Sequence, residues 1–192
     1  MNEYVTFKKK GEIHVKEALL IVDMSNDFVA DDGSLTAGEN AQKIVPEIVR
    51  LANEFIKKDQ VVAVCMDAHE KDDEHFELWP PHNIKGTKGQ ELYGELYDWY
   101  KEHQHLENVL YIPKTEYDAF FETNLEEELK KRKVTTVHIT GACTDICDFL
   151  TAYGAYARGF KTVTYQNATA TFTDNHEVFL KQMNAIFKTE IR

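Results

Sequence analysis

Short, almost continuous apolar runs alternate along the chain with longer amphipathic segments. The apolar runs predict buried strands over residues 18–24, 61–67, 109–114, 134–141 and 161–168. Between and after them, apolar residues recur at helical spacing, which predicts helices over 41–57, 90–103 and 125–133, from 145 onward, and over 175–187. Strands that alternate with helices are typical of a parallel sheet covered on both faces. The pattern therefore predicts an α/β protein: a three-layer α/β/α fold whose mostly parallel central sheet has five or six strands.

The same pattern predicts how the chain is organised. Its 192 residues, 43% of them hydrophobic, are enough for one sizeable core, and no stretch resembles an interdomain linker. We therefore expect a single domain over 1–192, with an N-terminal arm over 1–16. Residues 68–108 break the alternation and are rich in His, Trp, Tyr, Gly and Pro, so we interpret them as an insertion that builds a metal and substrate site.

Charge and cysteine content narrow the classes of partner. A formal net charge of −11 argues against nucleic acid or an anionic membrane as a partner, because both require clustered Lys and Arg. No apolar run has the length of a membrane span, and no signal peptide is recognisable. Three cysteines are an odd number for a secreted disulfide framework. We therefore expect a cytoplasmic protein with reduced thiols.

Ionisable side chains stand where the predicted strands end. Asp23, Asp67 and Lys114 each close an apolar run, and Cys147 lies in the first turn of the helix that follows the fourth strand. Ligands of open α/β sheets bind at the carboxyl ends of the strands, so these four residues can converge. Each alone has a structural interpretation, as a turn residue, a surface lysine or a small core residue. Together they form a Cys-Lys-Asp hydrolytic set, with a thiol to attack, an ammonium to favour thiolate and an acid to accept the proton.

A second cluster lies at the start of the insertion. Asp67 and His69 flank one residue at a strand end, and His82 follows two prolines. Carboxylate and imidazole ligands suit Zn²⁺, Mn²⁺ or Fe²⁺. The alternative is a solvated acidic loop with unrelated histidines.

Five stretches in the right order resemble one family. They are LLIVDMSNDFVADDGSLTAG, MDAHE, WPPHNIKGTKGQELYG, PKTEYDAF and GACTDICDFLTAYGAY. The chain is similar to the nicotinamidase branch of the isochorismatase-like cysteine hydrolases, and the histidine-rich insertion belongs to that branch. The resemblance implies the isochorismatase-like hydrolase fold with a metal-binding insertion. It also implies that Cys147 is the nucleophile, Asp23 the general acid and base, and Lys114 the third catalytic residue.

The resemblance further implies the rest of the site. Asp67, His69 and His82 become metal ligands, and a glutamate between the histidines completes or supports the shell, where Glu77 fits better than Glu74. A cis peptide bond precedes Cys143, and the backbone N–H groups of Cys143 and Cys147 form the oxyanion hole. Aromatic walls around a flat substrate ring fall at Phe28, Trp79 and Tyr117.

The activity implied is hydrolysis of nicotinamide to nicotinate and ammonia through a cysteine thioester, in NAD salvage. One divalent metal ion per subunit, with zinc expected before manganese or iron, and a homo-oligomer are implied as well. Another small amide, pyrazinamide-like or a carbamoyl compound, is an alternative substrate, and a non-catalytic metal-binding module is an alternative of another class. Thiol redox chemistry by Cys143 and Cys147 is disfavoured because three residues separate them, whereas the usual redox pair has two.

Overall fold

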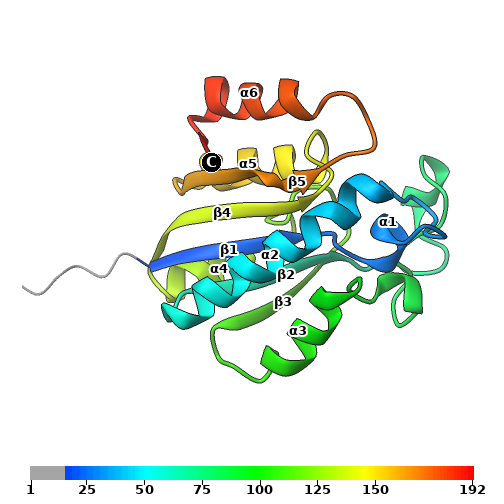
Figure 1. Ribbon diagram of the computed structural model, residues 1–192, viewed down its shortest axis with the longest axis horizontal. Helices are drawn as coiled ribbons and strands as arrows, with labels where there is room; N and C mark the ends of the chain where they lie inside the picture. The colour runs from blue at the N-terminus through cyan, green and yellow to red at the C-terminus, as the bar shows by residue number, and fades with distance from the viewer. Residues whose placement is uncertain (1–15) are drawn as a thin grey trace, which may run out of the picture.

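One parallel sheet of six strands forms the centre of the computed structural model, which describes residues 16–192 (Figure 1). The sheet order is β3-β2-β1-β4-β5-β6. The strands are β1 (Lys16–Val22), β2 (Val61–Asp67), β3 (Val109–Lys114), β4 (Val134–Ala142), β5 (Lys161–Ala170) and β6 (Glu190–Ile191). The predicted arm falls outside the described residues except for Lys16, which begins β1.

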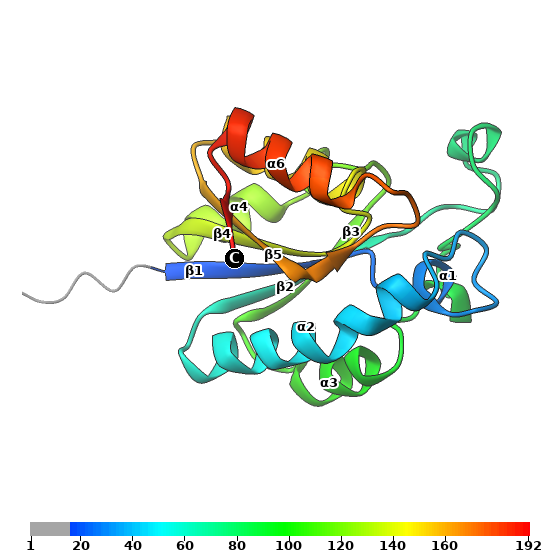
Figure 2. The same ribbon diagram turned by 45° about the horizontal axis from the view of Figure 1, so that its top comes forward.

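Helices cover both faces of this sheet (Figure 2). They are α1 (Asn26–Val29), α2 (Glu39–Lys57), α3 (Glu95–His103), α4 (Leu125–Lys131), α5 (Cys147–Ala157) and α6 (His176–Phe187), with short 3₁₀ helices η1 (Glu74–Glu77) and η2 (Lys88–Gln90). α2 and α3 lie on one face, and α4, α5 and α6 lie on the other. The predicted three-layer α/β/α architecture is confirmed. Within residues 16–192, no helix combines the length and apolar character needed to cross a bilayer.

Residues that alternate along β1 contribute to two hydrophobic cores, one on each face of the sheet. Leu19 and Ile21 of β1 pack on the α2 side, whereas Leu20 packs with Val137 and Leu129 on the α4 side. Successive side chains of a strand point to opposite faces, so a strand buried on both faces must be apolar at every position. This explains why the apolar runs of β1 and β2 carry no polar alternation.

Several element boundaries differ from those predicted. The first strand ends at Val22, because Asp23 has a φ of 53° and leaves the extended conformation. The helix expected from residue 90 begins only after Gly94, and 88–90 form η2 instead. The helix expected from 145 begins at Cys147 itself. The sixth strand, β6, is only two residues long and gave no recognisable apolar run.

The strand order reverses between β1 and β4, and this point lies beside the predicted catalytic residues. Asp23 follows β1, and the loop from β4 leads to Cys147. At the same place Gly141 has a φ of 128°, and any Cβ there would collide with the backbone of Val22. A glycine is therefore needed where β4 passes closest to β1, and ligands of such sheets bind at this switch point.

Candidate active site

Three strand ends bring together a buried ionic group. Lys114 Nζ lies 2.6 Å from Asp23 Oδ2 and also pairs with Asp67 Oδ1. The backbone N–H of Asp67 donates to Asp23 Oδ1 at 2.9 Å, and Lys114 Nζ also donates to the Glu116 carbonyl at 3.1 Å. All three charged side chains are buried. Two carboxylates thus share one ammonium group away from bulk water, as expected from their positions at adjacent parallel strands.

Burial and neighbouring charges shift the pKa values of the two carboxylates in opposite directions. Burial raises the pKa of Asp23 to about 6, and the negative charge of Asp67 adds to the rise. Burial also acts to raise the pKa of Asp67, but the Lys114 charge and the contacts with its two histidines outweigh it and lower that pKa. Burial opposes the charge on Lys114, yet the two carboxylates hold its pKa well above the usual value. Asp23 is therefore suited to exchange a proton, whereas Asp67 stays anionic beside a permanent ammonium.

Cys147 is the first residue of α5 and is buried beside this group. Burial raises the pKa of its thiol well above the usual value, and the Lys114 charge acts in the opposite direction. In the loop before it, the Ala142–Cys143 peptide bond is cis, as the resemblance implies. The N–H groups of Ile146 and Asp148 both donate to the Cys143 carbonyl, at 3.0 and 3.1 Å. The nucleophile candidate is thus a neutral thiol that needs a base to form thiolate.

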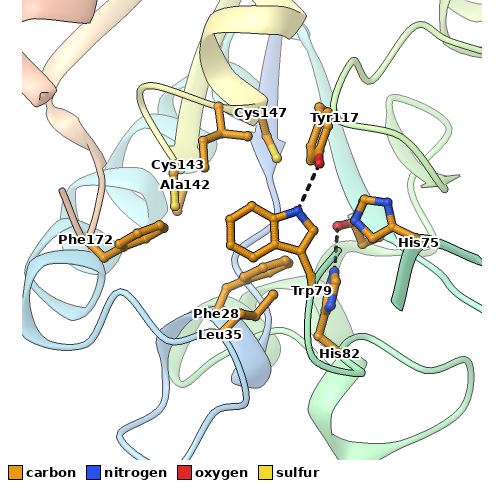
Figure 3. A pocket seen from close by; sticks show the side chains of 12 residues that line it. Phe28, Leu35, His75, Trp79, His82, Tyr117, Ala142, Cys143, Cys147 and Phe172 are labelled. Atoms are coloured by element: carbon orange, nitrogen blue, oxygen red, sulfur yellow. Dashed lines mark hydrogen bonds and ion pairs between the residues drawn. The ribbon is translucent and has the colours of Figure 1, made fainter. Parts of the chain in front are cut away.

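A pocket that is partly open to solvent lies over this thiol (Figure 3). Its lining comes from Phe28, Leu35, Asp67, His75, Trp79, His82, Tyr117, Ala142, Cys143, Ile146, Cys147 and Phe172. The three predicted aromatic residues, Phe28, Trp79 and Tyr117, are all part of it, and Trp79 Nε1 donates to the Tyr117 hydroxyl at 2.9 Å. The pocket therefore combines a mainly aromatic and aliphatic wall with a thiol and imidazoles.

Imidazole rings gather on one side of the pocket. His69, His75 and His82 each offer a ligand atom, and all three atoms lie within 4.8 Å of one another. His69 and His75 stack with their ring centroids 4.8 Å apart, and His82 meets His69 edge-on at 4.9 Å. Outer partners fix two of the rings: the Asp73 carboxylate contacts His69 Nδ1 at 3.0 Å, and His82 Nδ1 donates to the Pro80 carbonyl at 2.7 Å. Such outer contacts are the usual way in which metal-binding histidines are oriented.

The donor set fits a divalent metal ion. His69 Nε2 is buried and has no hydrogen-bond partner. Asp67 Oδ2 lies 3.7 Å from Nε2 of His69 and 3.7 Å from Nε2 of His82, too far for hydrogen bonds. Ligand atoms bound tetrahedrally to one zinc ion stand about 3.4 Å apart, given metal–ligand distances of about 2.1 Å. Asp67, His69 and His82 are thus already spaced as ligands of a shared ion.

The structure unites the predicted ligands Asp67, His69 and His82, but it does not bring in the fourth one. Glu77 and Glu74 are both exposed on η1, and neither belongs to the group of converging ligand atoms. His75, from the same 3₁₀ helix, points inward instead. The sequence did contain a usable indication, because imidazole is a commoner zinc ligand than glutamate and His75 lies between the two predicted histidines. Leu35, Ile146 and Phe172 are further pocket residues that the sequence gave no reason to select.

Comparison with known proteins identifies the family. A profile of the isochorismatase domain matches residues 17–191. The chain belongs to the isochorismatase domain family. An isochorismatase family protein of Bacillus subtilis, described as uncharacterized, is 45% identical over 161 residues, covering 82% of this chain and 88% of the relative.

Two solved structures have a similar fold. The crystal structure of a nicotinamidase from Bacillus subtilis has a TM-score of 0.90 and 43% identity, covering 92% of this chain and 99% of that one. A pyrazinamidase of Pyrococcus horikoshii in complex with zinc has a TM-score of 0.81 and 26% identity, covering 92% of this chain and 98% of that one. The family and its nicotinamidase-like fold, first indicated by short motifs, are thereby confirmed, and membership supports a hydrolase.

Proposed function

We propose that this isochorismatase-family protein is a nicotinamidase, which hydrolyses nicotinamide to nicotinate and ammonia through a thioester on Cys147. The observation that carries the proposal is the composition of one pocket. It presents the Cys147 thiol, the histidine cluster and the Asp67 carboxylate of the buried Asp23–Lys114–Asp67 group to the same small space. The likeness to a solved nicotinamidase supports the choice of substrate.

In the first step, Asp23 accepts the proton of the Cys147 thiol. The raised pKa of Asp23, about 6, brings it closer to that of a thiol than an exposed carboxylate would be. Lys114 stabilises the thiolate by its charge. The sulfur then attacks the carboxamide carbon, a C–S bond forms, and the electron pair of the C=O bond moves to oxygen.

In the following steps, the backbone N–H groups of Cys143 and Cys147 donate to this oxyanion. A donor of this kind is typically worth about 3 kcal/mol in the transition state. Asp23 returns its proton to the departing nitrogen, the C–N bond breaks and ammonia leaves. Asp23 then deprotonates a water molecule, which attacks the thioester, releases nicotinate and regenerates the thiol.

Asp67, His69, His75 and His82 are the residues that would hold a divalent ion. When bound, such an ion supplies a Lewis-acid position for the pyridine nitrogen, directly or through a coordinated water. Zinc is the first choice, supported by the zinc complex of the Pyrococcus horikoshii relative, with manganese or iron as alternatives. Phe28, Trp79 and Tyr117 then restrict a planar ring to one orientation, with its carboxamide over the thiol.

The proposed activity also concerns the pathway, the location and the assembly of the protein. The activity would serve NAD salvage, because nicotinate is a precursor that such pathways reuse. A cytoplasmic location is supported by the free cysteines, which suit a reducing compartment. A homo-oligomer is proposed from the family resemblance.

The test measures ammonia release from nicotinamide by the purified protein, with and without prior chelation and with Cys147→Ala as control. The proposal expects rapid release that disappears on chelation, returns with zinc and is absent in the variant. No release by fully metallated protein would overturn nicotinamide as the substrate. A panel with pyrazinamide and carbamoyl compounds would then separate another amidase from a module that binds metal without catalysis.

A further inference from the structure

Phe172 lines the pocket but takes no part in the proposed chemistry. It belongs to the segment between β5 and α6, and its ring points into the pocket next to Cys143, on the side opposite His75 (Figure 3). The side chain is 52% exposed. A phenylalanine that faces a pocket while remaining half exposed gains little from core packing at that position.

One carboxylate holds the backbone on both sides of this ring. Thr171 Oγ1 donates to Asp145 Oδ1 at 2.6 Å, and Thr173 Oγ1 donates to Asp145 Oδ2 at 2.5 Å. Hydrogen bonds to a charged acceptor are roughly twice as strong as those between neutral groups. The two threonines flank Phe172, so the paired bonds limit the movement of the residue between them.

The same carboxylate belongs to the loop that carries the nucleophile. Asp145 lies midway between Cys143 and Cys147, and the N–H of Thr144 donates to the Ala170 carbonyl at 2.9 Å. Asn40 of α2 adds a further bond, from its side-chain nitrogen to the Thr171 carbonyl at 3.1 Å. The position of the Phe172 ring is thus tied to the position of the Cys147 thiol.

We propose that Phe172 is a specificity-determining residue that closes the pocket opposite the histidines, and that Asp145 positions it through Thr171 and Thr173. This inference rests on the proposed function for the identity of the ring, a planar heteroaromatic amide. With the ring nitrogen toward the histidines and the carboxamide at Cys147, the opposite ring edge faces Phe172. Phe172 therefore limits how large a substituent that edge can carry.

A first experiment tests the closure without any assumption about the substrate. The rate of Cys147 alkylation is measured by mass spectrometry with a small reagent, iodoacetamide, and a bulky one, N-phenylmaleimide. The Cys147→Ala variant shows how much of the measured alkylation occurs at the other two cysteines. Phe172→Ala should raise the ratio of bulky to small reagent rates about tenfold, whereas an unchanged ratio would overturn the proposal.

A second experiment tests specificity with nicotinamide and 5-methylnicotinamide, whose methyl group lies on the far ring edge without crowding the carboxamide. Phe172→Ala should raise kcat/KM for the methylated amide, relative to that for nicotinamide, about tenfold, the scale expected for one methyl group in an apolar pocket. It should also raise the KM for nicotinamide more than it changes kcat. An unchanged ratio would overturn the role in specificity. If wild type hydrolyses neither amide but the alkylation ratio responds, nicotinamidase activity fails and the closure stands.

Variants of Thr173 test the positioning, because Thr173 does not itself line the pocket. Thr173→Val removes one hydroxyl and should shift the alkylation ratio in the same direction as Phe172→Ala, by a smaller factor. Thr173→Ser keeps the hydroxyl and should restore the wild-type ratio. Phe121→Ala is the matched control, since Phe121 is 48% exposed and lies outside the pocket, and it should leave both ratios unchanged. A Thr173→Val ratio equal to wild type would remove Asp145 from the proposal.

Discussion

Lys114 Nζ lies 2.6 Å from Asp23 Oδ2, and both side chains are completely buried. The same ammonium pairs with Asp67, so one positive charge faces two carboxylates in a site from which bulk water is excluded. Burying charges is costly unless each has a partner, and removing the shared partner leaves two like charges close together. This pair therefore links the stability of the sheet end to the chemistry proposed for Cys147.

Replacing Lys114 with methionine should lower the free energy of unfolding by about 3–5 kcal/mol, the range for breaking a buried ion pair. It should also abolish amide hydrolysis, because the thiolate loses its nearby positive charge. Urea unfolding and ammonia release measure the two effects. Lys85→Met is the control, because Lys85 forms an exposed pair with Glu70 and its loss should change stability by no more than about 0.5 kcal/mol. Equal losses in the two variants would contradict a structural role for the shared ammonium.

The two cysteines of the pocket should differ sharply on substitution. Cys147→Ala should lower turnover by at least about 10³-fold while metal stays bound, since covalent catalysis requires the thiol. Cys143→Ala should keep turnover within about tenfold of wild type, because Cys143 is proposed to act through its backbone N–H, which alanine retains. Steady-state ammonia release and metal analysis measure both variants. A comparable loss of turnover in the two variants would instead indicate that both thiols take part in the reaction.

Metal affinity should distinguish His75 from Glu77. His75→Ala removes an imidazole of the cluster and should weaken zinc binding by about 100-fold or more, given that loss of an outer partner alone costs about 10–100-fold. Glu77→Gln changes an exposed carboxylate on the same 3₁₀ helix and should leave zinc affinity unchanged. Competition titration against a chromophoric chelator gives both values. A large effect of Glu77→Gln would restore this residue to the ligand set.

His138 should make the fold sensitive to mild acid. Its ring is buried in β4, with Nδ1 2.9 Å from the Tyr165 hydroxyl and Nε2 3.3 Å from Glu17 Oε2. Burial lowers the pKa of this imidazole to about 4, and the charge of Arg192 adds to the effect. The unfolded chain, with a pKa of about 6.5, binds the proton more readily. Stability is therefore fully present above pH of about 6.5 and falls as the pH drops toward about 4.

The expected size of this effect is about 2 kcal/mol between pH 7 and pH 5. Urea unfolding of wild type and of His138→Gln at both pH values isolates it, because the variant should lose about that much less on acidification. His105→Asn, which changes an exposed histidine, should leave the pH dependence as in wild type. If acidification lowered the free energy of unfolding of His138→Gln as much as that of wild type, the buried imidazole would not be the cause of the acid sensitivity.

The residues at the strand ends were the part of the site that the sequence predicted well. Asp23, Asp67 and Lys114 close apolar runs, and parallel strands place their carboxyl ends along one edge, so convergence followed from the pattern alone. The irregular insertion was harder, because its backbone has no repeating geometry from which side-chain direction can be deduced. Glu77 and His75 lie two residues apart on η1, and only the folded loop decides which one points inward.

The sequence by itself determined the α/β architecture, the buried acids and lysine, and the place of the thiol at a helix start, because hydrophobic period and strand direction fix these features locally. Only the tertiary structure decided the third imidazole and the approach of Phe172. Both depend on contacts between segments far apart in the chain, such as the hydrogen bonds that Thr171 and Thr173 donate to Asp145. Periodicity describes which face of an element is buried, but it does not describe which loop closes over which pocket.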